Sequence, residues 1–438
     1  MCGIVAIVGR EAVAGRLFEG LRRLEYRGYD SAGICTIDAG RFDRRRAEGK
    51  LDNLGRELAA APLGGEVGIA HTRWATHGAP TVGNAHPHIV GKVALVHNGI
   101  IENFKILRDE LITDGREFQS ETDSEVVAHL VAREVERGAA PADAVATVLP
   151  RLHGAFAIAF LFEDHPELVI GARMGAPLTV GYGAQGPGGG ENYLGSDALA
   201  LAPLTQRIAY LDEGDWAVVE RDTVRIFDRD NQPVEREIVA SGASSARIDK
   251  GNHAHFMRKE IFEQPIVVAQ TLQSYVRPFE GEVALPELGF DLAAIDRVTI
   301  VACGTSFYAG MVAKYWFEQF ARVPVDIDVA SEFRYRQPVL EKGGLALFIS
   351  QSGETADTLA ALRHARAEGQ VIAVVVNVPT SSMAREADLL LPTHAGPEIG
   401  FDLAGIHRVT IVACGTSYYA GMVAKYWFEQ FARVPVDI

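Results

Sequence analysis

Cysteine is the second residue of this chain, and a thiol at that position has chemistry that no other place in the sequence offers. Removal of Met1 would leave Cys2 carrying both its thiol and a free α-amino group. An α-amino group has a reference pKa of about 7.7–8.0, so it can accept the thiol proton during nucleophilic attack. Cys2 is therefore a candidate nucleophile with its own base. The alternative is that a small cysteine simply opens a buried strand, since MCGIVAIVG is also apolar.

Five polar motifs follow Cys2 within the first 125 residues. They are RGYDSAG (27–33), HTRWATHG (71–78), NAHPH (84–88), HNGIIEN (97–103) and SETD (120–123). Together with MCGIVAIVG they resemble class II glutamine amidotransferases, and specifically the glutaminase domain of the glucosamine-6-phosphate synthase family. The resemblance covers nearly all of residues 2–230. It implies an α+β N-terminal nucleophile hydrolase domain with four αββα layers, which hydrolyses glutamine through a cysteine thioester and releases ammonia.

The same resemblance assigns roles to individual side chains. Cys2 is the nucleophile, while the side chain of Asn98 and the backbone N–H of Gly99 form the oxyanion hole. Arg73 clamps the glutamine carboxylate with its guanidinium fork, and Asp123 receives the α-ammonium group. The residues expected to line or close the same pocket are Arg27, Gly28, Trp74, Thr76 and His77.

Some of these polar side chains could instead have a purely structural role. Arg73 and Asp123 could form an ion pair, and His86 and His88 could pack within a loop instead of binding a metal. No third ligand accompanies the HxH spacing, and the four widely spaced cysteines form no CxxC pair. We therefore expect no metal, no cofactor and no disulfide framework.

From Arg297 onward the chain alternates apolar strands, short hydroxyl-rich loops and helices, which is typical of a parallel sheet covered by helices. One loop reads CGTS (303–306) and another reads SQSGET (350–355). Helix N-termini with hydroxyl side chains can bind phosphate without a lysine. Helix N-capping by Ser and Thr is the competing explanation.

These two loops resemble the sugar isomerase (SIS) domain of the same family. The resemblance implies a three-layer α/β domain over 286–400. It assigns contacts with the phosphate and hydroxyls of fructose 6-phosphate to Thr305, Ser306, Ser350, Gln351, Ser352 and Thr355. Cys303, beside the first loop, is expected to be packing instead of chemistry.

The remaining organisation is a linker with a helical connection over 231–285 and a repeat at the end. Residues 400–438 copy residues 289–327 and differ only at Gly405, His407 and Tyr418. Diverged structural repeats do not look like this. We treat 401–438 as a partial copy of 290–327, with the family's second SIS domain absent.

Bulk composition limits the partners. The formal net charge of −15 argues against nucleic-acid binding, and no apolar stretch approaches the length of a membrane span. We expect a cytoplasmic enzyme whose partners are glutamine and fructose 6-phosphate, and a homodimer by analogy with SIS domains.

The sequence thus predicts a glutamine–fructose-6-phosphate aminotransferase type of enzyme with an intact glutaminase half. Without the second SIS domain, these residues alone are expected not to complete the isomerase step. The alternatives are a sugar-phosphate-binding regulatory module with an inactive glutaminase half, or a defective fragment.

Overall fold

The structure is a computed structural model. It describes residues 2–25, 28, 30–74, 77–184, 190–240, 253, 256–277, 282–283, 285–286, 288–336 and 338–396, with two short strands at 409–410 and 436–437. Contacts divide the chain into one compact unit, Met1–Ser245 with Val283–Thr393, and a second, Ala246–Glu282 with His394–Ile438. Arg27, Thr76, residues 241–252 of the linker and nearly all of the repeat lie outside the described residues.

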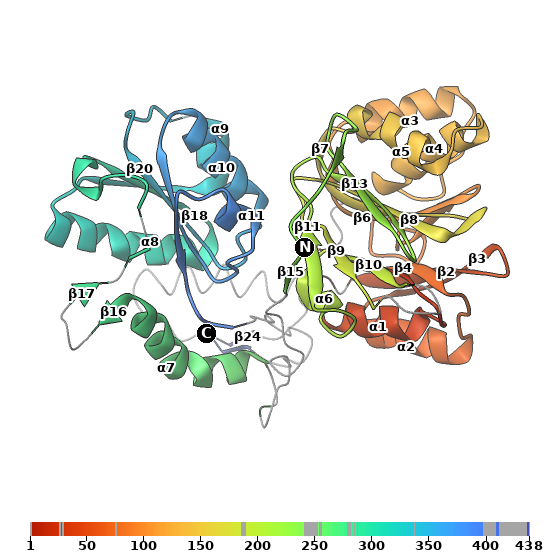
Figure 1. The fold of residues 1–438 in the computed structure, drawn as a ribbon, viewed down its shortest axis with the longest axis horizontal. Helices are drawn as coiled ribbons and strands as arrows, with labels where there is room; N and C mark the ends of the chain where they lie inside the picture. The colour runs from red at the N-terminus through yellow and green to blue at the C-terminus, as the bar shows by residue number, and fades with distance from the viewer. Residues whose placement is uncertain are drawn as a thin grey trace. The chain divides into compact units, whose positions relative to one another are not determined.

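Two antiparallel sheets dominate the described residues up to 240 (Figure 1). The eight-stranded sheet has the order β15-β11-β9-β10-β1-β4-β2-β3. Its strands are β1 (Gly3–Val8), β2 (Ser31–Asp38), β3 (Arg41–Glu48), β4 (Val67–Arg73), β9 (Thr179–Tyr182), β10 (Asn192–Gly195), β11 (Arg207–Tyr210) and β15 (Val239–Ala240).

The described residues also form a seven-stranded sheet in the order β14-β13-β12-β8-β7-β6-β5. Its strands are β5 (His88–Val90), β6 (Val93–Ile101), β7 (Gly154–Phe162), β8 (His165–Met174), β12 (Trp216–Glu220), β13 (Val224–Phe227) and β14 (Pro233–Val234). The helices of this part are α1 (Ala14–Arg22), α2 (Leu51–Ala60), α3 (Phe104–Thr113), α4 (Ser124–Glu136), α5 (Pro141–Val148) and α6 (Ala198–Leu201), and a 3₁₀ turn follows at Leu149–Arg151.

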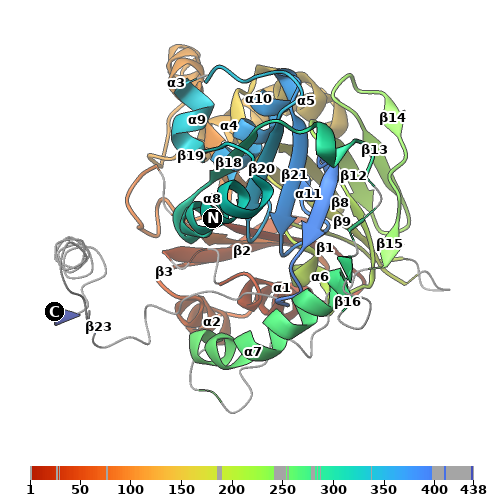
Figure 2. The same cartoon turned by 90° about the vertical axis from the view of Figure 1, so that its left-hand side faces the viewer.

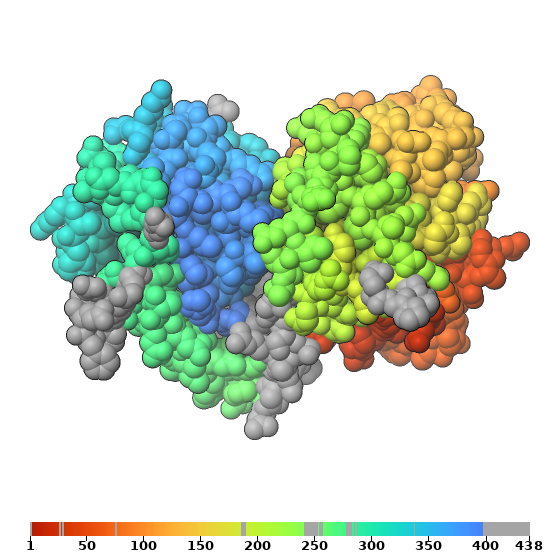
Figure 3. All heavy atoms as spheres, in the orientation of Figure 1, coloured from red at the N-terminus to blue at the C-terminus, as the bar shows by residue number. Residues whose placement is uncertain are grey.

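Three apolar clusters stack these elements into four layers. The central cluster joins the two sheets, with Ile4 and Ile69 from one sheet against Val96 and Ala159 from the other. A second cluster packs α1 and α2 on the outer face of the eight-stranded sheet, and a third packs α3 to α5 on the outer face of the other sheet. Figure 3 shows α3 to α5 in orange and yellow on one side of this part, and α1 and α2 in red on the opposite side. The expected αββα fold is confirmed.

A five-stranded parallel sheet, in the order β19-β18-β20-β21-β22, follows in the described residues after 288. Its strands are β18 (Val298–Ala302), β19 (Val325–Val329), β20 (Leu345–Ser350), β21 (Val371–Val376) and β22 (Leu389–Pro392). The helices are α8 (Gly304–Trp316), α9 (Ala330–Arg336), α10 (Ala356–Ala367) and α11 (Ser382–Arg385), with a 3₁₀ turn at Leu292–Ala294.

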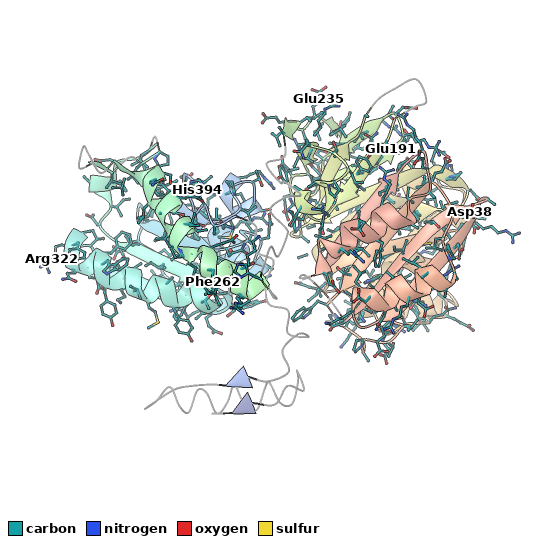
Figure 4. All side chains as sticks on the ribbon, turned by 90° about the horizontal axis from the view of Figure 1, so that it is seen from below. Asp38, Glu191, Glu235, Phe262, Arg322 and His394 are labelled. Carbon is teal, nitrogen blue, oxygen red and sulfur yellow. The ribbon has the colours of Figure 1, made fainter. Side chains whose placement is uncertain are left out.

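Helices cover both faces of the parallel sheet (Figure 2). On one face, α8 packs its Ala313 among the sheet's apolar side chains. On the other, α9 and α10 pack Phe333 and Leu362. A π-helical turn, Phe317–Ala321, extends α8, and Arg322 ends it in the left-handed region with φ 57° (Figure 4). The expected three-layer α/β domain is therefore confirmed.

The second unit contains helix α7 (Phe256–Tyr275), which lies within the stretch 231–285 where a helical connection was expected. It exposes large apolar side chains, including Phe262, which Figure 4 labels. Short strands β16 (Val276–Arg277) and β17 (Glu282–Val283) form a two-stranded sheet, as do β23 (Val409–Thr410) and β24 (Val436–Asp437). No helix among the described residues is long and apolar enough to cross a membrane.

Candidate active site

Cys2 lies directly before β1, beside the end of β4. The backbone N–H of Trp74 donates a hydrogen bond to the Cys2 Sγ at 3.2 Å, and Asn98 Nδ2 donates to the Cys2 carbonyl oxygen at 3.1 Å. Burial raises the pKa of the Cys2 thiol, so at neutral pH the sulfur holds its proton until a base removes it. The structure thus brings the candidate nucleophile, Trp74 and the candidate oxyanion donor together.

Two glycines of the motifs occupy positions that a side chain would block. Gly99 has φ 117°, and a Cβ atom there would lie 2.0 Å from the carbonyl oxygen of Ala155. A Cβ at Gly28 would lie 2.6 Å from the carbonyl carbon of Arg73. Gly99 therefore turns the backbone next to Asn98, and Gly28 allows its loop to lie against the Arg73–Trp74 peptide.

Arg73 ends β4 and is only 4% exposed. Its guanidinium donates hydrogen bonds to backbone carbonyls of the loop that follows, those of His77, Gly78 and Ala79. Burial lowers its pKa, and none of the ion pairs found among the described residues involves it. The expected alternative of an Arg73–Asp123 ion pair is absent from these residues, although the charges of Asp30 and Asp123 both act to raise the pKa of Arg73.

Asp123 immediately precedes α4 and is also 4% exposed. Its Oδ2 accepts a hydrogen bond from the backbone N–H of Ile101 at 2.8 Å, which ties the carboxylate to the end of β6, two residues beyond Gly99. Asp123 therefore lies close to the strand that carries Asn98 and Gly99.

The ring of His77 packs edge-on against the ring of Phe104, and the two ring centroids are 5.1 Å apart.

A network of buried histidines lies behind Asn98, and the sequence predicted no catalytic role for any of them. His71 contacts Asn98, His86 contacts His71, and His97 Nδ1 lies 2.8 Å from the hydroxyl of Ser124. His71 and His97 are polar residues in otherwise apolar strands, whereas His86 precedes β5, and all three lie within the polar motifs at 71–78, 84–88 and 97–103. His88 Nε2 lies 3.0 Å from Thr122 Oγ1, and no group of three His, Cys, Asp or Glu in the described ranges could hold a metal ion.

The two hydroxyl loops of the parallel sheet lie at one edge. Strands β18 and β20 are neighbours, with Ala302 paired to Ile349, so the loops that follow them emerge side by side. The hydroxyls of Ser350 and Ser352 accept backbone hydrogen bonds within their own loop, from Gly353 at 3.0 Å and Glu354 at 3.2 Å.

Neither helix that follows these loops is capped by a side chain. Cys303 and Thr355 are the N-cap residues of α8 and α10, and neither makes a side-chain cap hydrogen bond. Thr305 is exposed and Ser306 is half-buried in the first turn of α8. Cys303 receives a hydrogen bond from Thr358 of α10 at 3.8 Å, which links the first loop to the helix that follows the second.

Comparisons with known proteins identify two regions of the chain, one in the antiparallel part and one in the part with the parallel sheet. Residues 71–201 match the family model of the glutamine amidotransferase domain, and residues 291–406 match that of the SIS domain. The chain therefore combines a glutamine amidotransferase domain with a SIS domain.

The chain is a homologue of enzymes named glutamine–fructose-6-phosphate aminotransferase (isomerizing). It is 71% identical to the one from Zymomonas mobilis over 400 residues, which are 91% of this chain and 65% of that protein. Identity to the one from Brucella abortus is 59% over the same shares. The chain thus spans just under two thirds of the length of these relatives.

Among solved structures, the C-terminal domain of glucosamine-fructose-6-phosphate aminotransferase from Francisella tularensis is 43% identical. The match covers 34% of this chain and 42% of that one, with a TM-score of 0.32.

Proposed function

We propose that this chain hydrolyses glutamine through a thioester on Cys2 and supplies the released ammonia to a sugar phosphate bound by its SIS domain. The observation that carries the proposal is the hydrogen bonding of Cys2 to both Trp74 and Asn98, at 3.2 and 3.1 Å. The nucleophile and a donor for the developing oxyanion are then adjacent before any substrate binds.

In the proposed reaction, removal of Met1 frees the α-amine of Cys2. Because burial raises the pKa of the thiol, the amine must take its proton as sulfur attacks the carboxamide carbon. Asn98 Nδ2 and the Gly99 N–H stabilise the oxyanion, and the amine returns the proton to the departing ammonia. Water then hydrolyses the thioester to glutamate.

Substrate recognition follows from the two buried charged groups. Among the described residues, Arg73 donates hydrogen bonds to backbone carbonyls and forms no ion pair, so a glutamine carboxylate supplies its counter-ion. Asp123, fixed by the Ile101 N–H, accepts the α-ammonium group. Trp74, His77, Gly28, Arg27 and Thr76 are assigned to the same pocket by resemblance.

For the sugar phosphate we propose fructose 6-phosphate, held at the first turns of α8 and α10 by Thr305, Ser306 and the SQSGET loop. The uncapped helix ends at neighbouring strands support an anion site there. The product would be glucosamine 6-phosphate. The curated relatives are longer than the matched region, so we propose that these 438 residues alone release ammonia without completing the isomerisation.

The test is glutamate release by the purified chain, with loss of Met1 verified by mass spectrometry. Cys2→Ala is expected to lower the rate at least about 1,000-fold, as when a covalent nucleophile is removed. Cys35→Ala is the matched control, because Cys35 is fully buried in β2 and burial raises its pKa to about 12. Unchanged hydrolysis by Cys2→Ala would refute the proposal.

The alternative, a regulatory module without glutaminase activity, would bind fructose 6-phosphate but release no glutamate with or without it. Formation of glucosamine 6-phosphate by the isolated 438 residues would contradict the incomplete isomerase step and leave the glutaminase proposal intact.

The proposal extends to a homodimer, by analogy with SIS domains. Helix α8 supports this because it exposes a row of large side chains along one side: Tyr308, Met311, Val312, Tyr315 and Trp316. Such rows mark protein interfaces. Sedimentation should give twice the chain mass, and Tyr315→Glu should shift it towards one chain mass. A wild-type monomer at all concentrations would contradict the dimer.

A further inference from the structure

The candidate oxyanion donor Asn98 is backed by a histidine from the opposite sheet. Asn98 belongs to β6 of the seven-stranded sheet, whereas His71 belongs to β4 of the eight-stranded sheet. His71 is fully buried, and its Nε2 lies 3.0 Å from Asn98 Oδ1 and 2.9 Å from the carbonyl oxygen of His97. This contact crosses the interface between the two sheets at the end where Cys2 lies.

The carbonyl of His97 decides which atom donates. A carbonyl oxygen can only accept, so His71 Nε2 must carry the hydrogen. The same N–H points to the side-chain amide of Asn98, and only the oxygen of that amide can accept from it. The neutral His71 tautomer with hydrogen on Nε2 therefore dictates the orientation of the Asn98 amide.

The other end of Asn98 agrees with this orientation. With Oδ1 towards His71, Nδ2 faces Cys2 and donates to its carbonyl oxygen at 3.1 Å. A flipped amide would place N–H against N–H at His71 and oxygen against oxygen at Cys2. Each such mismatch leaves buried polar groups unpaired, which is unfavourable.

His86 keeps His71 in the required tautomer. His71 Nδ1 has no hydrogen when Nε2 carries one, so it accepts from His86 Nδ1 at 3.1 Å. Burial lowers the pKa of His71 to about 3 and lowers that of His86 as well, so both rings are neutral across the physiological range. A charged His71 would instead carry a second N–H facing that of His86.

We propose that His71 is a positioning residue for glutamine hydrolysis, which holds the amide of Asn98 so that its N–H groups face the oxyanion formed at Cys2. The inference rests on the proposed glutaminase function and assigns a role to a residue that does not itself contact substrate. It predicts that His71 acts on kcat through Asn98 and leaves the glutamine KM nearly unchanged, because the carboxylate and ammonium sites are elsewhere.

Two substitutions separate this role from simple packing. Glutamine at position 71 can place its amide N–H where His71 Nε2 lies, whereas asparagine reaches only the position of Nδ1. His71→Gln is expected to retain kcat within about threefold, and His71→Asn to lose about 10- to 1,000-fold, up to the loss typical of one oxyanion donor. The KM of both variants should stay within about threefold of wild type.

A double-mutant cycle with Asn98→Ala gives the decisive comparison. If His71 acts through Asn98, the kcat of the double variant should be less than about threefold below that of Asn98→Ala alone. Thermal melting and circular dichroism verify that each variant folds. Should His71→Asn not fold, His71→Phe, which keeps the ring volume and lacks the donor, takes its place with the same expected loss.

Any of three outcomes would overturn the inference. The variant that lacks the donor could keep the wild-type kcat, or His71→Gln could lose as much kcat as that variant does. In the third outcome, the losses caused by the position 71 substitution and by Asn98→Ala multiply in the double variant. If the wild-type chain itself releases no glutamate, the proposed function fails and this inference fails with it. An active wild type with any of the three patterns refutes the role of His71 alone.

Discussion

At the scale of single residues, the candidate site depends on groups whose backbone conformation or side-chain position is restricted by the fold. Gly99 has a backbone conformation that L side chains rarely adopt, and Ala155 leaves no room for a Cβ. Arg73 and Asp123 are both almost completely buried, yet each has hydrogen-bond partners from the backbone. Such positions respond to substitution in ways that can be tested separately for stability and for activity.

Gly99→Ala should destroy the oxyanion site and destabilise the domain, because the added Cβ would force β6 and β7 apart. We expect at least about 100-fold slower glutamate release, in line with loss of an oxyanion donor. Gly115→Ala is the matched control, with φ 82° but open space around the Cβ position. It should cost only about 1–2 kcal/mol of stability and leave kcat unchanged. Equal effects of the two variants would refute the steric argument.

The buried histidines should make stability depend on pH. Burial lowers the pKa of His71 and His88 to about 3, whereas an unfolded histidine titrates near about 6.5. Between these values the unfolded chain binds more protons, so the free energy of unfolding falls as pH drops from 6.5 towards 3. Each histidine contributes up to about 1.4 kcal/mol per pH unit.

Urea denaturation at pH 7 and pH 5 measures this dependence. His88→Gln should reduce the slope by one proton, since glutamine can still reach Thr122. His165→Gln, at a partly exposed position in β8, is the matched control for replacing a histidine by glutamine. A flat profile in the wild-type protein would contradict the burial argument.

At the scale of elements, the parallel strands bring two helix N-termini to one edge, where we propose that the sugar phosphate binds. The first turn of α10 contains Asp357, which is paired with Arg334. The first turn of α8 contains no acidic residue, although an acid there would stabilise the helix. This absence is consistent with a site reserved for an anionic ligand.

Thr305→Asp should therefore have opposite effects on folding and on binding. The new carboxylate stabilises the helix by about 0.3–1 kcal/mol, but it repels a phosphate at the same position. Calorimetry should show at least about tenfold weaker binding of fructose 6-phosphate. Ala309→Asp, an exposed position one turn further along α8, supplies the same charge as a control and should bind nearly as wild type. Equal weakening by both variants would place the phosphate elsewhere.

At the scale of the whole molecule, the three apolar clusters of the amidotransferase part lie within residues 4–234. Both sheets have their outer faces covered by helices from the same stretch. This part therefore has the complete layered core that an independent domain requires.

A fragment of residues 1–240 should consequently fold and hydrolyse glutamine at a rate within about tenfold of the whole chain, since its core is complete. Circular dichroism, thermal melting and glutamate release measure this directly. An insoluble or inactive fragment beside an active whole chain would show that the remaining residues are needed for the glutaminase fold.

Much of the architecture was predictable from sequence patterns. The parallel sheet, its hydroxyl loops and a helical connection between the two parts followed from strand–loop–helix alternation and periodicity, which are local properties. The resemblance of the five motifs named the candidate nucleophile and the glutamine-binding residues. The structure brings together those among them that it describes.

The sequence by itself determined which residue types are candidates for the proposed chemistry: a cysteine next to the start, an Asn-Gly pair, an arginine and an acid before a helix. Only the tertiary structure decided how these groups are oriented. His71 and Asn98 are 27 residues apart on strands of different sheets, so no spacing in the sequence predicts their contact. The stacking of the two sheets fixes it, because hydrogen-bond direction at the oxyanion donor depends on which side chains meet across the interface.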